Sequence, residues 1–125
     1  LSIPATKGVE IGGGFAQARM TGRESNDAFE MRDGRVRTVT NNAGGTLAGI
    51  STGEEIIVRV AIKPTSSIEQ DQATVTTDQQ PTSVKVVGRH DPSVVPRAVP
   101  VVEAMLANVL ADLYLRNRAT RIDWP

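Results

Sequence analysis

Arg89, His90 and Asp91 bring three chemically capable side chains into consecutive positions, directly after a glycine. The guanidinium of Arg89 could bind a phosphate or a carboxylate through two parallel hydrogen bonds. Asp91 could act as a base, orient the His90 imidazole or form an ion pair with Arg89, and the spacing alone leaves these roles open. Three prolines between residues 92 and 100 stiffen the segment, so it can hold charged side chains in place.

A second polar cluster, Lys63-Pro64-Thr65-Ser66-Ser67, directly follows an apolar run. A lysine and three hydroxyl groups suit an anionic ligand, since the lysine supplies charge and the hydroxyl and backbone N–H groups supply directional donors. A polar turn with a solvated lysine is an equally good interpretation of this segment.

The run Asn42-Ala43-Gly44-Gly45 is the third candidate. Glycines permit positive φ and let the backbone approach a phosphate or a planar ring closely. Because glycine-rich segments are more often tight turns, the sequence favours a structural role here.

Strands and one long helix must position these loops. The nearly continuous apolar run within residues 55–62 predicts the clearest strand, buried on both faces. Further strands are expected at 1–11, 35–39, 73–77 and 83–87, with the last two forming a hairpin around a turn at 78–81. We expect a short helix at 15–20, loops at 21–33 and 41–53, and a frayed tail at 120–125.

The helix is expected from about Ala98 to Arg118, with Pro100 in its first turn. Its apolar positions recur at helical spacing, which predicts one buried face. These positions are Val102, Met105, Leu106, Val109, Leu110 and Leu113.

The composition limits the classes of function. The chain has 125 residues, enough for one domain with a modest core. Fourteen Lys and Arg residues balance fourteen Asp and Glu residues, which argues against nucleic-acid binding. The absence of Cys and the single His argue against a disulfide framework and a metal site. No apolar run approaches the ~20 residues that span a bilayer, so no membrane partner is expected. From the residues alone, we predict an α/β domain with polar loops suited to an anion.

Four ordered segments resemble the chorismate synthase family. The family's C-terminal signature is matched by Arg89-His90-Asp91-Pro92-Ser93, followed by Ala98, Pro100-Val101 and Glu103-Ala104-Met105. The upstream matches are Ile3–Gly12, Asn42–Gly45 with Gly49–Ser51, and Lys63–Ile68. The resemblance covers essentially the whole chain but only the C-terminal third of the family. The chain is thus expected to be a single domain, 1–125, that lacks the N-terminal region and its two histidines thought to act as acids.

The resemblance implies a fold and a function. The fold would be part of the family's β-α-β sandwich, with mixed or antiparallel strands followed by a long C-terminal helix. The family's enzymes are lyases of aromatic amino acid biosynthesis. They convert 5-enolpyruvylshikimate-3-phosphate to chorismate by 1,4-anti elimination of phosphate, and they require reduced FMN without net redox change. A cytoplasmic homotetramer is implied.

The resemblance also implies roles for individual residues. Asp91 would lie near flavin N5 in the proton path, and Arg89 would contact FMN or the charge of the substrate. Arg97 is a weaker candidate for substrate or phosphate binding. The remaining FMN-binding positions would be Pro4 and Ala5 through their backbone, Ala48, and the loop Lys63, Pro64, Thr65, Ser66 and Ser67.

One of these positions departs from the family pattern, because Ala48 replaces a usual glycine. The substitution is harmless if φ is negative at this position, and it strains the loop by about 1 kcal/mol if φ is positive. The competing interpretation of the whole chain is a catalytically inactive C-terminal fragment that only folds and self-associates.

Overall fold

A computed structural model describes residues 1–121, and the chain divides into two compact units at Lys63 and Pro64. The first unit contains β1 (Thr6–Ile11), the 3-10 helix η1 (Gly14–Arg19), α1 (Gly22–Ser25), β2 (Phe29–Arg32), β3 (Arg35–Thr38), β4 (Thr46–Leu47), β5 (Ile50–Ser51) and β6 (Val58–Ile62). The second contains β7 (Asp71–Val75), β8 (Pro81–Lys85) and α2 (Val95–Thr120). Residues 122–125 of the expected frayed tail lie outside the described residues.

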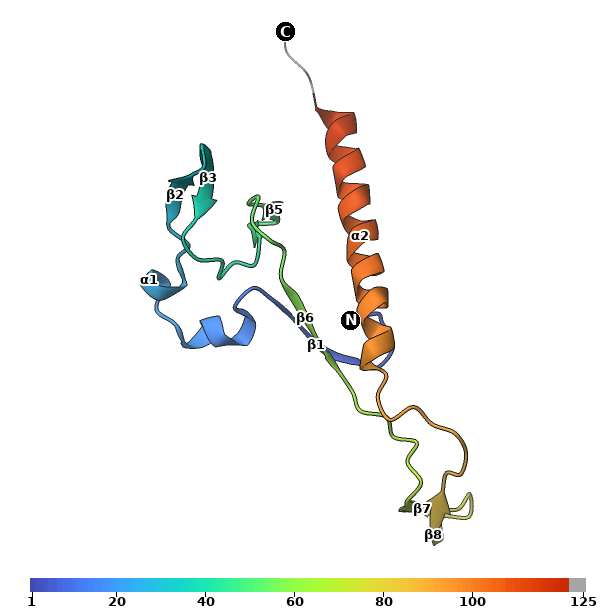
Figure 1. Ribbon diagram of the computed structural model, residues 1–125. Helices are drawn as coiled ribbons and strands as arrows, with labels where there is room; N and C mark the ends of the chain where they lie inside the picture. The colour runs from blue at the N-terminus through green and yellow to red at the C-terminus, as the bar shows by residue number, and fades with distance from the viewer. Residues whose placement is uncertain (122–125) are drawn as a thin grey trace. The chain divides into compact units, whose positions relative to one another are not determined.

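All strand pairs in the described chain are antiparallel and two-stranded, and the long helix follows them, as expected (Figure 1). β1 and β6 lie side by side, and Glu10 on β1 faces Arg59 on β6. The two-sided burial predicted for this apolar run is wrong. β6 pairs with β1 alone and alternates between half-buried and exposed residues, because a continuous apolar run does not specify how many strands flank it.

Tight turns with positive φ close two hairpins. Asp33 and Gly34 (φ 52° and 72°) join β2 to β3, and Ala48 and Gly49 (φ 50° and 79°) join β4 to β5. Positive φ at both central residues is the requirement of the type I′ turn, which matches the twist of paired strands. The polar loop predicted at 21–33 is therefore partly wrong, and the Asp-Gly pair was the signal for the hairpin.

The same segment also contains α1, whose N-terminus carries a capping box. The Glu24 amide donates to Thr21 Oγ1 (3.3 Å), and the Thr21 amide donates to Glu24 Oε2 (2.7 Å). These bonds satisfy two otherwise free donors, so a helix of only four residues has a defined start. The Thr-Gly-Arg-Glu sequence was its signal.

The predicted hairpin of the second unit is confirmed, although both strands begin two residues earlier than expected. β7 pairs with β8 from Asp71 opposite Lys85 to Val75 opposite Pro81. The loop between them is closed by the Thr76 amide, which donates to the Gln80 carbonyl at 2.9 Å.

α2 is a 26-residue helix that begins three residues before the predicted start. Pro96 lies in its first turn, where a missing N–H costs nothing. Pro100 lies inside the helix rather than in the first turn. There it removes the hydrogen bond that residue 100 would otherwise donate to the Pro96 carbonyl.

The predicted burial of the apolar face of α2 is wrong for this chain. None of its residues is buried, and Leu113 remains 55% exposed. No hydrophobic side chain is buried anywhere in residues 1–121. By length and composition alone, α2 is long and apolar enough to cross a membrane, which was not expected from the sequence. The core helix of a soluble protein can meet the same criterion.

Two glycine backbones approach each other closely in the first unit. Gly12 and Gly44 are buried and have positive φ (58° and 65°). A Cβ on Gly44 would lie 2.3 Å from the Gly12 nitrogen, and a Cβ on Gly12 would lie 2.1 Å from the Asn42 oxygen. Only glycine fits either position.

We predict that Gly44→Ala destabilises the protein by roughly 3 kcal/mol or more, because backbone strain adds to a steric clash. Gly49→Ala is the matched control. It has positive φ but no neighbouring atom within 4 Å, so it should cost only about 1 kcal/mol. Urea unfolding measured by circular dichroism compares the two, and equal losses would contradict the role of the contact.

Candidate functional site

Asp27 connects the segment after α1 to the glycine-rich loop. Its Oδ1 accepts hydrogen bonds from Thr40 Oγ1 (2.6 Å) and the Asn42 amide (2.8 Å), and its Oδ2 accepts from the Ala43 amide (2.8 Å). Partial burial opposes ionisation of this carboxyl group, but the bonds from Thr40, Ala43 and Asn42 outweigh it and lower the pKa of Asp27. Asp27 thus remains an anion that orders the loop.

Asn41 fixes the other side of this loop. Its Oδ1 accepts from the Gly45 amide at 2.8 Å, and its Nδ2 donates to the Glu55 carbonyl at 2.9 Å. A Cβ on Gly45 would lie 2.5 Å from the same Glu55 oxygen. The glycines of this loop therefore face the chain's own backbone, which supports the structural interpretation of the motif.

A cavity of about 410 Å³ lies beside this loop, and Ala48 and Asp27 are among its lining residues. Neutral polar side chains (Gln17, Asn26) and an aromatic ring (Phe29) also line it. Ala48 has a φ of 50°, so alanine in place of the usual glycine strains the loop. The turn carries about 1 kcal/mol of strain that glycine would avoid.

Ala5 and Lys63, two predicted cofactor-binding residues from opposite ends of the first unit, are brought together. The Lys63 amide donates to the Ala5 carbonyl at 2.7 Å, at the end of the β1–β6 ladder. Ala5 has a φ of 66°, and the Thr6 amide donates to the Ile3 carbonyl at 3.2 Å. Pro4 therefore lies within a tight turn, and the Lys63 side chain is exposed.

In the second unit, a cavity of about 250 Å³ gathers Thr65 and Ser67 of the predicted cofactor loop with His90 and Asp91. The Thr65 hydroxyl is inaccessible to solvent and has no hydrogen-bond partner. A buried hydroxyl without a partner is costly, so this atom is suited to bonding with a ligand. Pro64 and Ser66 belong to the same loop but do not line the cavity.

Asp91 forms an ion pair with Arg97, not with Arg89. Arg97 Nη1 lies 2.8 Å from Asp91 Oδ2. In the described part of the chain, Arg89 is exposed and makes no hydrogen bond or ion pair, and His90 does not bond to Asp91. Of the roles left open for Asp91, the ion pair with Arg89 is therefore not formed, and the carboxylate pairs with a residue of α2 instead.

Asp27 was not identified from the sequence as a residue that orders a loop, and Arg97 was not identified as the ion-pair partner of Asp91. Asp27 lies in a segment that was predicted as a loop, and its partners are 13 to 16 residues away, so no local pattern identifies it. Arg97 was considered only for substrate or phosphate binding. No group of three His, Cys, Asp or Glu residues suited to a metal ion occurs among residues 1–121.

Comparison with known proteins gives a consistent result. A family model described as chorismate synthase matches residues 1–115. The chorismate synthase of Chloroflexus aurantiacus is 59% identical over 124 residues, which cover 98% of this chain and 34% of that protein. That of Synechococcus elongatus is 55% identical over 125 residues, or 99% of this chain and 34% of that protein. A crystal structure of chorismate synthase aligns with a TM-score of 0.47 and 48% identity over 50% of this chain and 19% of that chain. The chain spans about a third of the length of the relatives it matches.

We predict that Asp27→Asn destabilises the protein by about 1–3 kcal/mol at pH 7, because it weakens hydrogen bonds to a charged group. The folded-state pKa of Asp27 lies below its ordinary 3.8. Its contribution is therefore complete above that value and is lost as the pH falls further. Urea unfolding at pH 7 and near pH 3 should show the difference from the unsubstituted protein shrinking.

Asp33→Asn is the control for this prediction. Asp33 occupies a turn position with φ of 52°, which Asn also tolerates, and its side chain makes no hydrogen bond within residues 1–121. An equal loss in both variants, or a pH-independent loss for Asp27→Asn, would contradict the role assigned to Asp27.

Proposed function

Because the chain belongs to the chorismate synthase family, we propose that the protein to which it contributes converts 5-enolpyruvylshikimate-3-phosphate to chorismate. The reaction is a 1,4-anti elimination of phosphate in aromatic amino acid biosynthesis. The observation that carries this proposal is 59% identity across 98% of the chain, with all four motifs in order. The family comprises soluble biosynthetic enzymes, and the proposed compartment is the cytoplasm.

The proposed cofactor is reduced FMN, which supplies electron density as phosphate leaves. The partnerless Thr65 hydroxyl supports this assignment, since a ligand atom would satisfy it. Lys63 and Arg89 contribute exposed cations for the anionic groups of FMN or the substrate. The other residues that would hold FMN are Pro4, Ala5, Ala48, Pro64, Ser66 and Ser67.

Asp91 is the proposed proton-handling residue. Asp91 lines the same cavity as Thr65 and Ser67, so we place it beside a group bound by that loop. A positioned carboxylate can accept or orient the proton that the elimination removes from C6.

The remaining two thirds of the protein are required by this proposal, because they carry the rest of the pocket and the two histidines. Both units of the chain are then parts of one domain, and the assembled enzyme is a homotetramer. The alternative is a catalytically inactive fragment that folds and self-associates. The exposed apolar face of α2 is the observation that favours it.

We predict that Lys63→Ala weakens FMN binding by about 1.5–3 kcal/mol, the range for a hydrogen bond to a charged group. A suitable protein is a chimera in which residues 1–125 replace the corresponding third of the Chloroflexus aurantiacus chorismate synthase. Anaerobic flavin titration measures the dissociation constant. Lys85→Ala, an exposed lysine on β8, is the control and should leave FMN binding unchanged. Unaltered binding in Lys63→Ala would refute the cofactor assignment.

We predict that Asp91→Asn in the same chimera lowers turnover by roughly 10²–10⁴-fold, because it preserves shape and removes the proton acceptor. FMN binding should change little. Single-turnover kinetics with flavin absorbance measure this effect, and normal rates would leave Asp91 with only an ion-pair role. The isolated 125-residue chain is the negative control, and turnover by it at the rate of the chimera would contradict the need for the remaining pocket.

A further inference from the structure

We propose that Arg97 is a positioning residue for Asp91, holding its carboxylate in place and affecting the reaction only through it. This inference rests on the function proposed above. It assigns a role within that site to a residue in the first turn of α2.

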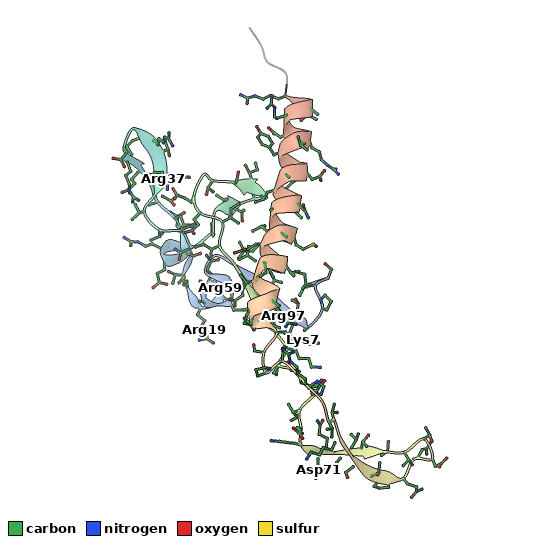
Figure 2. The ribbon with its side chains drawn as sticks, turned by 45° about the vertical axis from the view of Figure 1, so that its right-hand side comes forward. Lys7, Arg19, Arg37, Arg59, Asp71 and Arg97 are labelled. Carbon is green, nitrogen blue, oxygen red and sulfur yellow. The ribbon has the colours of Figure 1, made fainter. Side chains whose placement is uncertain are left out.

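The geometry is a short connection between a loop and a helix. Figure 2 shows Arg97 at the start of α2, and its Nη1 lies 2.8 Å from Asp91 Oδ2. The Arg97 amide donates to the Val94 carbonyl at 3.1 Å, so helical backbone fixes the base of the side chain. The ion pair therefore ties the residue before Pro92 to a rigid element.

Arg97 pairs with Asp91 but does not line the cavity. The cavity is lined by Thr65, Ser67, His90 and Asp91, among others, but not by Arg97. The Oδ1 atom of Asp91 accepts no hydrogen bond from residues 1–121. One carboxylate oxygen is thus held by Arg97 while the other remains available to a bound ligand, which distinguishes positioning from direct binding.

Stability alone does not explain this contact. The Arg97 side chain is 76% exposed, and an ion pair so open to water contributes little to folding. Glu69 lines the same cavity, which therefore has a second acidic residue besides Asp91. The cation of Arg97, paired with Asp91, offsets the negative charge of these two residues and holds the Asp91 carboxylate in place.

The test uses the chimera with residues 1–125. Arg97→Gln should lower kcat by about 10- to 100-fold, since a displacement of about 1 Å in an aligned group can cost about 10²-fold. KM and the FMN dissociation constant should remain unchanged. Arg97→Lys should recover most of the activity, because it keeps a positive charge that can pair with the Asp91 carboxylate.

Arg116→Gln is the matched control. Arg116 lies on the same helix, pairs with Asp112 at 3.0 Å and is 75% exposed. It should leave kcat unchanged, and both variants should show equally small changes in urea unfolding. In the Asp91→Asn background, Arg97→Gln should have no further effect, because a residue that acts only through Asp91 is then redundant.

If Asp91→Asn lowers turnover as predicted, three results would overturn the role of Arg97 without affecting the proposed function. They are an unchanged kcat in Arg97→Gln, a raised FMN dissociation constant or KM in Arg97→Gln, and a further loss of kcat when Arg97→Gln is added to Asp91→Asn. The last two would identify Arg97 as a direct ligand-binding residue. A folded chimera without activity, or full activity in Asp91→Asn, would overturn the proposed function and this inference with it.

Discussion

The first unit depends on the approach of two glycine backbones, Gly12 at the end of β1 and Gly44 in the loop before β4. The Gly12 amide donates to the Ile57 carbonyl at 2.9 Å, and the Gly44 carbonyl accepts from the Ile57 amide at 3.2 Å. The chain leading into β6 thus bonds to both glycines. No side chain can enter this crossing, so the path of three segments is determined by backbone geometry rather than by burial of apolar groups.

In the first unit, hydrogen bonds from polar side chains therefore fix the path of the chain, which packing of a hydrophobic core fixes in most domains. Asp27 and Asn41 bind the amides and a carbonyl of the crossing segments, while no hydrophobic side chain in residues 1–121 is buried. Such bonds define local geometry, but each contributes only about 1 kcal/mol to stability, or about 1.5–3 kcal/mol where the acceptor is charged, as at Asp27. A chain that spans about a third of its relatives and exposes the apolar face of α2 has precise loops without the burial that normally stabilises them.

Short sequence patterns predicted those features that depend on neighbouring residues in the chain. Turn residues predicted the hairpin at Asp71–Lys85, and apolar spacing predicted that α2 is a helix. The burial expected for β6 and α2 was wrong, because an apolar pattern identifies the face of an element that can be buried but not the element that covers it. Side-chain pairs between residues that are not close neighbours in the chain could not be predicted from the sequence either. Asp91 has an arginine two residues before it, yet it pairs with Arg97, six residues after it, since the first turn of α2 brings that side chain back toward the loop.

Some of the positions that break local rules are among those we propose to bind the cofactor. Four residues other than glycine have positive φ, and two of them are Ala5 and Ala48. The Thr65 hydroxyl is buried without a partner, as are those of Thr6 and Thr38, which we do not assign to the cofactor site. Each feature costs free energy in the protein by itself. Natural sequences violate such rules mainly at functional sites, where a ligand or the chemistry compensates. Asp33, Ala48 and Gln79 lie in hairpin turns, which account for their positive φ, whereas Ala5 lies in no hairpin. The positive φ at Ala5 belongs to a tight turn, in which the Thr6 amide donates to the Ile3 carbonyl and Pro4 precedes Ala5. Positive φ at the third residue, after a proline, is what such a turn requires, and we propose that its backbone also contacts the cofactor.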